Sequence, residues 1–236
     1  MARTRRADEP NELPTARLGS VLATQADDTL SWVTHAALDL LEGVDYVSIT
    51  TVHRGKVEGT VGSTDPLALK ADLMQYELDQ GPCLDVALGE KIAQSVDLEQ
   101  DSTWPEYSTQ AAQLGVRSQL ALRIESAGET MGSLNLYSTR RGQFEPSTVA
   151  GGKRLAAQAA TALEMTRTAG HLSRMLASRS HIAQATGLLM ARHQWTSHQA
   201  FGHLVKLSQN KNVKLREIAR DLVESANEDV TDGVAS

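Results

Sequence analysis

One helical pattern, from residue 144 to residue 193, constrains the fold of this chain more than any other feature. The stretch is rich in alanine and contains no proline after Pro146. A seven-residue repeat lies on its second half, and such a repeat is typical of a left-handed coiled coil. One seam position of the repeat holds Met165, Leu172, Arg179 and Thr186, and the other holds Ala169, Leu176, Ala183 and Met190.

The seam changes character along its length, because Arg179 and Thr186 are polar. We therefore expect a homodimeric coiled coil through about Leu176, which then opens into a C-terminal helical module. Its expected contacts are Met165, Ala169, Leu172, Leu176 and Arg179. The alternative is a single helix that packs only within its own domain.

Shorter elements precede the long helix. β-Branched, alternating segments predict strands at 45–52, 56–62, 91–96, 116–124 and 130–137, and apolar spacing predicts helices at 18–41, 66–78 and 104–114. The sequence Gln-Gly-Pro-Cys at residues 80–83 breaks the pattern and predicts a tight connection. Together these elements predict a twisted antiparallel sheet flanked by helices, which is an α+β fold.

Two short helices are predicted after the long one, at residues 196–208 and 213–226. Thr196 and Gln199 have the spacing of a capping box at the start of the first. With the end of the long helix they form an all-α three-helix module. The chain thus divides into a disordered head (1–17), an α+β domain (18–164), a coiled-coil stalk with the module (165–226) and a flexible tail (227–236).

Charge separates these parts. Residues 167–220 hold nine Lys or Arg and one acid, Glu217, whereas residues 7–166 carry a formal charge of −12 within a chain of net charge −6. A salt-bridged helix surface mixes both signs, so the shortage of acids indicates a surface that binds a polyanion. A solvated helix surface is the simpler alternative.

Composition excludes several classes of protein. No apolar run approaches the length needed to cross a bilayer, and the Arg-rich N-terminus lacks the apolar core of a secretory signal. The single cysteine, Cys83, excludes an internal disulfide framework. Five histidines lie between residues 171 and 203, but without the spacing of a metal site. No phosphate loop or nucleophile–base arrangement is present, so we expect a cytoplasmic protein that is not an enzyme, without a metal or cofactor.

The C-terminal part resembles the ANTAR domain, a three-helix RNA-binding module of transcription antiterminators. The resemblance extends over more than forty positions and is far more specific than a short motif. It is carried by Ser178, Arg179, Ile182, Ala185, Gly187, Leu189, Met190, Ala200, Phe201, Leu204, Ser208, Gln209, Asn212, Lys214, Leu215, Arg216 and Ala219.

The part before it resembles the GAF domains that precede ANTAR modules in regulators. The matching residues are 48–50, 80–84, 104–105, 115–118 and 132–138. The resemblance implies a sensory domain, with a small effector between sheet and helices as an option that no residue set here defines. Cys83 is a candidate sensor of oxidants, although a lone cysteine after Gly-Pro is more often a small buried apolar residue.

The RNA-binding end implied by the resemblance agrees with the charge pattern. Arginine and lysine contact phosphates, and neutral donors and acceptors contact bases or 2′-hydroxyls. We expect Trp195 to join two helices, with base stacking as the alternative, and Ala185, Gly187 and Ala200 to permit close helix packing. The candidate RNA-binding residues are Arg179, Arg192, Lys206, Ser208, Gln209, Lys211, Asn212, Lys214, Arg216 and Arg220.

The resemblance further implies a target of paired RNA hairpins in leader transcripts, whose binding disfavours an overlapping terminator. The chain departs from the family pattern at Thr186 and Val205, where many relatives carry Lys or Arg. Each departure removes a phosphate contact and predicts weaker, less salt-sensitive binding.

Two other functions stay open at this point. A short basic helix also fits the major groove of DNA, as in a DNA-binding regulator. A basic face also docks acidic partners, and the −12 region of this chain is one such partner. That intramolecular contact between the GAF-like and ANTAR-like parts would be autoinhibitory.

Overall fold

The computed structural model describes residues 14–142 and 144–234. The described residues divide into two compact units, one within 21–168 and the other made of 14–20 and 169–234. The elements in chain order are α1 (Pro14–Leu40), β1 (Tyr46–His53), β2 (Lys56–Val61), α2 (Pro66–Leu78), α3 (Pro82–Ala87), β3 (Ile92–Ser95), α4 (Pro105–Gln113), β4 (Ser118–Ser126), β5 (Glu129–Ser138), α5 (Pro146–His193), α6 (Ser197–Lys211) and α7 (Leu215–Val234).

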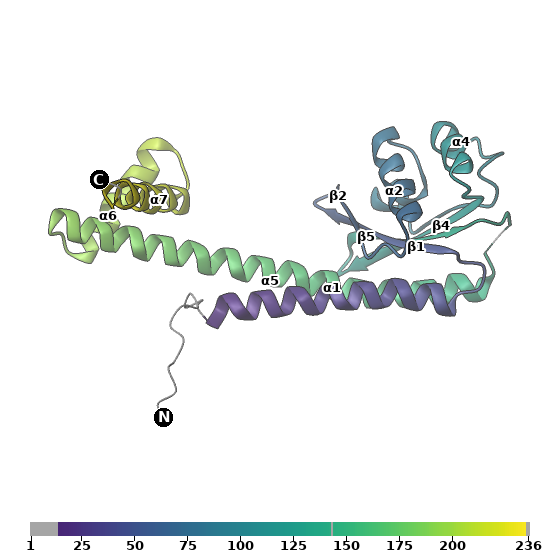
Figure 1. The fold of residues 1–236 in the computed structure, drawn as a ribbon, viewed down its shortest axis with the longest axis horizontal. Helices are drawn as coiled ribbons and strands as arrows, with labels where there is room; N and C mark the ends of the chain where they lie inside the picture. The colour runs from purple at the N-terminus through teal and green to yellow at the C-terminus, as the bar shows by residue number, and fades with distance from the viewer. Residues whose placement is uncertain (1–13, 143, 235–236) are drawn as a thin grey trace, which may run out of the picture. The chain divides into compact units, whose positions relative to one another are not determined.

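The five strands form one antiparallel sheet in the order β2-β1-β5-β4-β3. Helices α1 and α5 lie along one face, and α2 and α4 lie on the other (Figure 1). This is the predicted α+β fold, an antiparallel sheet flanked by helices, and the structure confirms it. The central strand β5 is buried over its last eight residues because both faces of the sheet are covered.

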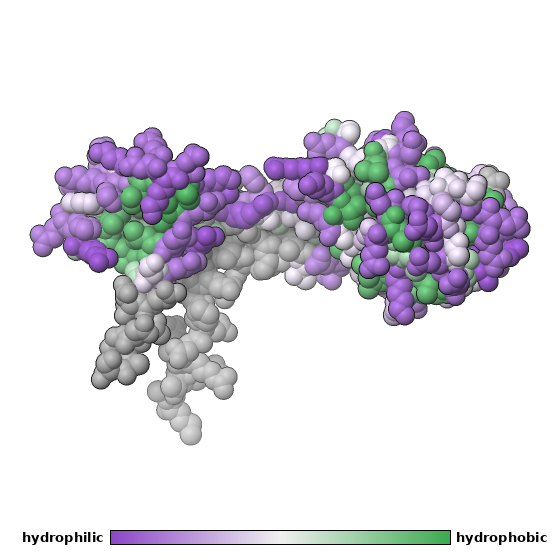
Figure 2. Space-filling view, turned by 90° about the horizontal axis from the view of Figure 1, so that it is seen from above, coloured by the Kyte–Doolittle hydropathy of each residue, from purple (hydrophilic) through white to green (hydrophobic). Residues whose placement is uncertain are grey.

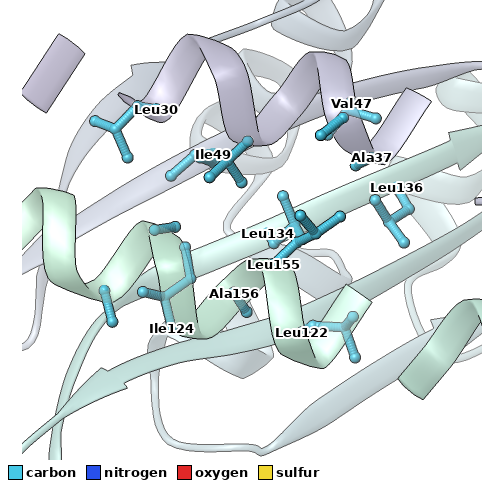
Figure 3. Close-up of a cluster of buried hydrophobic side chains, with 14 of the residues drawn as sticks. Leu30, Ala37, Val47, Ile49, Leu122, Ile124, Leu134, Leu136, Leu155 and Ala156 are labelled. Atoms are coloured by element: carbon cyan, nitrogen blue, oxygen red, sulfur yellow. The ribbon is translucent and has the colours of Figure 1, made fainter. Parts of the chain in front are cut away.

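Residue alternation along the strands separates two cores. Leu134 and Leu136 of β5 point to one face and pack with Ile49, Leu122 and residues of α1 and α5 (Figure 3). The alternating residues Asn135 and Tyr137 point to the opposite face, under α2 and α4. The first core consists mainly of apolar side chains, whereas the second face carries buried Ser, Thr, Asn and Tyr side chains.

Close packing of α5 on the sheet depends on Gly152. A Cβ atom at this position would overlap the Cδ1 atom of the fully buried Leu122. Glycine therefore lets the helix axis approach the sheet more closely than any other residue would.

The predicted connection at residues 80–83 is wrong in part, because helix α3 begins at Pro82. Proline suits the first turn of a helix, and Gly81 before it adopts φ = 136°, a conformation that favours glycine. The helix has only six residues, too few for a periodic apolar pattern to reveal it.

The C-terminal module contains the end of α5 together with α6 and α7. Its core consists of Ala185, Leu189, Ala200, Leu204 and Ala219, with Ile218 at its edge. The predicted capping box is confirmed, since the Thr196 hydroxyl accepts from the backbone of Gln199 and the Gln199 side chain accepts from the backbone of Thr196. The all-α three-helix module is therefore confirmed as well.

Helices extend into both of the predicted terminal segments. Helix α1 begins at Pro14, so residues 14–17 of the predicted head are helical, and residues 1–13 lie outside the described residues. Helix α7 continues to Val234 rather than ending near residue 226, since the sequence holds no helix breaker before Gly233. Residues 235–236 also lie outside the described residues.

The coiled-coil stalk stays a prediction, because the structure contains a single chain. The predicted seam residue Met165 is exposed, whereas Ala169 and Thr186 are buried. The Thr186 hydroxyl donates to the Ile182 carbonyl oxygen over 2.7 Å, so its polar group is satisfied within α5. The side chain of Leu176 lies outside the described residues.

Candidate functional site

The turn between α6 and α7 gathers several of the candidate RNA-binding residues. The Ser208 hydroxyl donates to the Val213 carbonyl oxygen over 2.6 Å, and Asn212 ends α6 in the left-handed conformation with φ = 51°. Ser208 therefore shapes the turn, while the side chain of Asn212 is exposed. Gln209 and Lys211 are exposed beside them.

The candidate RNA-binding lysines and arginines differ in whether an acidic side chain already pairs with them. Lys206, Lys211 and Lys214 are exposed, and the described residues offer them no ion pair. Arg220 contacts Asp221 at 3.2 Å and Glu224 at 3.7 Å, which partly neutralises it. Arg216 lies 3.9 Å from Glu217, a weak surface pair that a phosphate would displace.

Arg179 and Arg192 are exposed on α5, several turns apart. The module thus presents exposed lysine or arginine side chains on all three of its helices. Figure 2 shows an apolar area on this module bordered by hydrophilic residues. Phe201 of α6, one of the residues that carry the resemblance, is 44% exposed.

Trp195 connects the module to a set of rings that the sequence did not single out. Its indole is half-buried and packs on the core of the module, as expected for a residue that joins helices. The His193 ring stacks on it with centroids 4.4 Å apart, and His203 lies at 5.1 Å. Gln199, His203 and Lys206 also recur at the spacing of one helix face, and that spacing was the sequence signal that could have placed His203 near Trp195.

The small residues do not all act as predicted. Ala185 and Ala200 are fully buried and permit close helix packing. A Cβ atom at Gly187 would meet nothing within 4 Å, so the packing role predicted for this glycine is wrong.

The N-terminal unit holds a buried polar network on the sheet face under α2. Asp72 of α2 is its centre: its carboxylate accepts from Asn135 over 3.0 Å, from Thr60 over 2.9 Å and from Tyr137. Burial raises the pKa of Asp72 to about 6, and its hydrogen bonds offset part of that rise. No described cation pairs with this carboxylate.

The network extends toward the surface through Tyr76. Its hydroxyl lies 2.8 Å from the hydroxyl oxygens of both Thr50 and Thr60. The ring of Tyr76 also lines a hollow of about 410 Å³ between β2 and helices α2 and α3, together with apolar residues such as Leu84. Burial raises the pKa of the Tyr76 hydroxyl, so it stays a neutral hydrogen-bonding group.

Comparison with family models assigns both units. Residues 23–164 match the GAF domain, and residues 170–223 match the ANTAR domain. The chain belongs to the GAF–ANTAR family. It is a regulator in which a GAF sensory domain precedes an ANTAR RNA-binding domain.

A search of curated proteins finds no match. Among solved structures, type II free methionine-R-sulfoxide reductase from Thermoplasma acidophilum is 17% identical, with a TM-score of 0.46, over 60% of this chain and 94% of that chain. The GAF domain from Acinetobacter phosphoenolpyruvate-protein phosphotransferase is 16% identical, with a TM-score of 0.46, over 70% and 99%. These partial likenesses carry no function to this chain.

Cys83 of the GAF domain, the candidate oxidant sensor, is fully buried. Its backbone N–H donates to the Gln75 side chain over 3.0 Å. Burial raises the pKa of the thiol well above its ordinary value, which disfavours the reactive thiolate. The sensor role stays a prediction, and this environment slows any reaction of the thiol.

Neither a membrane-spanning helix nor a metal-ligand cluster is found in the part of the GAF–ANTAR chain that the structure describes. No described helix combines the length and the apolarity that a bilayer span requires. No group of three or more His, Cys, Asp or Glu among those residues is placed to hold a metal ion.

Proposed function

We propose that the chain is a cytoplasmic transcription antitermination regulator, and not an enzyme, whose ANTAR domain binds paired RNA hairpins under control of its GAF domain. The observation that carries the proposal is the concentration of exposed lysine and arginine side chains on a matched ANTAR domain. Residues 167–220 carry a formal charge of +8 in a chain of net charge −6. Bound hairpins would prevent the overlapping terminator from forming.

The α6–α7 turn is the centre of the proposed RNA interface. Lys211 and Lys214 flank Asn212, so two cations and an exposed amide lie within four residues. Cations neutralise phosphates and fix the register, while an amide reads the edge of an unpaired base. Arg216, Arg192 and Arg179 extend this basic surface.

The GAF domain supplies the signal in this proposal. The hollow of about 410 Å³ beside Tyr76 offers an effector both apolar contacts and, through the tyrosine hydroxyl, a route to the buried network. An effector that reorders Tyr76 would alter the hydrogen bonds of Thr50 and Thr60, and so the packing of α2 on the sheet.

A homodimer is the proposed functional state, because two hairpins require two ANTAR domains. The seam residue Met165 is 46% exposed and lies in a shallow, mainly apolar hollow with Thr161, Glu164 and Thr168. Such a residue is suited to a second copy of the helix. Sedimentation of the wild type and of Met165→Glu tests this. The wild type should sediment as a dimer and the variant should shift toward monomer. A wild type that sediments as a monomer would refute the dimer.

The RNA proposal is tested with a two-hairpin RNA from the leader of the chain's own operon. Lys214→Ala and Arg216→Ala should each weaken binding and make it less sensitive to salt. Lys70→Ala is the matched control, since Lys70 is an exposed base on α2 of the GAF domain. Equal competition by duplex DNA would favour the DNA-binding alternative instead.

The opposite charges of the two domains support a second, compatible proposal. The −12 and +8 regions attract each other at low salt, and their docking would mask the RNA surface. Small-angle scattering without RNA should then show the chain expanding as salt rises. A shape that is constant with salt would remove autoinhibition while leaving RNA binding in place.

A further inference from the structure

A second hollow lies on the ANTAR domain, away from the α6–α7 turn. It has a volume of about 420 Å³ and is lined by Trp195, His198, Gln199, Gly202, His203 and Lys206. These residues come from the connection after α5 and from one face of α6, at the spacing of successive helical turns. Gly202 leaves the wall between them open, because even a Cβ atom there would meet nothing within 4 Å.

The aromatic side of this hollow is held in place. The indole of Trp195 packs on the core of the domain, and the ring of His193 stacks on it with an interplanar angle of 21°. The ring of His203 stands beside the indole at an interplanar angle of 55°. A ring that packs on the core of its domain and contacts two other rings loses little freedom when a flat ligand adds to it.

The polar side of the hollow suits an anion attached to that flat ligand. Lys206 is exposed and reaches solvent at the edge of the hollow, and no described acid lines it. The Gln199 oxygen accepts from the backbone and hydroxyl of Thr196 at 2.9 and 3.0 Å. Its amide nitrogen therefore keeps two N–H donors that can point at acceptors of a ligand.

We propose that this hollow binds one unpaired nucleotide of the RNA, separately from the contacts of the α6–α7 turn. The base lies against the rings of Trp195 and His203, Gln199 donates to its edge, and Lys206 holds the adjoining phosphate. Unpaired loop bases are free to leave their stack for an aromatic ring, whereas paired bases are not. This inference rests on the proposed function, because it assigns a further contact to the same RNA.

The test uses the full chain and the two-hairpin leader RNA, with 2-aminopurine placed in turn at each unpaired loop position. One position should change its emission on binding, and an abasic site at that position should weaken binding by about 5- to 150-fold, the range of one base–aromatic stack. Trp195→Leu keeps the apolar packing and removes the ring. It should weaken binding of the intact RNA to the same degree and have no further effect on the abasic RNA.

Two other variants keep the test decisive. His203→Ala removes a half-buried ring from the side of the hollow and should lower the affinity even where Trp195→Leu unfolds the domain. Trp32→Leu is the control, because Trp32 is a 58% exposed tryptophan of the GAF domain. It should change nothing.

The failures are distinguishable. If RNA binds with its usual salt dependence but abasic loops and His203→Ala change nothing, the hollow is not a nucleotide site and the proposed function stands. If the wild-type chain binds no RNA at any salt concentration, both proposals fall.

Discussion

Asn135 donates a hydrogen bond to the carboxylate of Asp72 over 3.0 Å, and both side chains are completely buried. The contact joins the central strand β5 to helix α2 and lies between residues 63 positions apart in the chain. A buried carboxylate with no described cation beside it is stabilised by such hydrogen bonds. The packing of α2 on the sheet therefore depends on the protonation state of one residue.

The stability of the GAF domain should fall as pH rises from about 4 through about 6. The pKa of Asp72 is about 6 in the folded state, above the 3.8 of an ordinary aspartate. The folded state thus binds the proton more tightly, and this contribution is full below pH about 4 and is lost as pH rises through about 6. A shift of two pKa units corresponds to about 3 kcal/mol.

Asp72→Asn should remove most of that pH dependence. An asparagine can still accept from Asn135 and Tyr137 through its oxygen and donate to Thr60 through its nitrogen. Urea unfolding at a series of pH values between 4 and 7 measures the effect. A wild-type free energy of unfolding that rises with pH in this window, or a variant with the same slope, would contradict the assigned protonation.

Two glycines of α5 should respond in opposite ways to the same change. Gly152→Ala places a methyl group against Leu122 and should lower the free energy of unfolding of the GAF domain by about 1–3 kcal/mol. Gly187→Ala meets open space and should stabilise the ANTAR domain by up to about 1 kcal/mol. Thermal unfolding of both variants checks the pair. Equal effects at the two positions would refute the close approach at Gly152.

Asn212→Gly should separate the structural role of this residue from its proposed role in RNA binding. Glycine adopts φ = 51° without strain, so the α6–α7 turn and the melting temperature should stay almost unchanged. RNA affinity should fall, because the exposed amide is gone. Asn212→Ala is the comparison, and it should lower stability as well, by about 1 kcal/mol. Unchanged RNA affinity in the glycine variant would leave Asn212 as a helix cap only.

The thiol of Cys83 should react slowly with a disulfide reagent in the native chain. Burial raises its pKa and blocks access, so the rate should be far below that of an exposed cysteine and should rise steeply in urea. A native rate close to that of a free thiol would revive the oxidant-sensing role.

The strands were predictable where alternation alone decides them. The sequence around Ser48, Ile49 and Thr50 alternates as a strand must, and the structure places it in β1. What the polar residues of this strand face was not predictable. Their burial depends on pairing β1 with β5 and on α2 closing over both, which are contacts between distant parts of the chain.

The burial of polar side chains on helix α2 was likewise not predictable from the sequence. Its bounds were predicted correctly, but Asp72 and Gln75 are completely buried, whereas Leu73 is 46% exposed. A polar side chain on a helix is usually solvated, and only the neighbouring strands reverse that here. The buried network was therefore invisible in the sequence.

The ANTAR domain was more readable, because its contacts are local. Capping, spacing and charge each act within a few turns, so the capping box at Thr196 followed from the pattern. Leu204 and Ala219, two of the residues that carry the resemblance, are fully buried. The hollow beside Trp195 did not, since it depends on how the chain enters α6. The individual RNA contacts stay predictions.

Binding of the full chain to the two-hairpin leader RNA across a salt series is the most direct test of the central claim. If the ANTAR domain binds paired hairpins, binding should be selective over duplex DNA, with an affinity that falls steeply with salt. Lys214→Ala and Arg216→Ala should each reduce the slope by about one counterion, and Lys70→Ala should not change it. Binding that is insensitive to salt, or no preference for hairpin RNA over duplex DNA, would contradict the account.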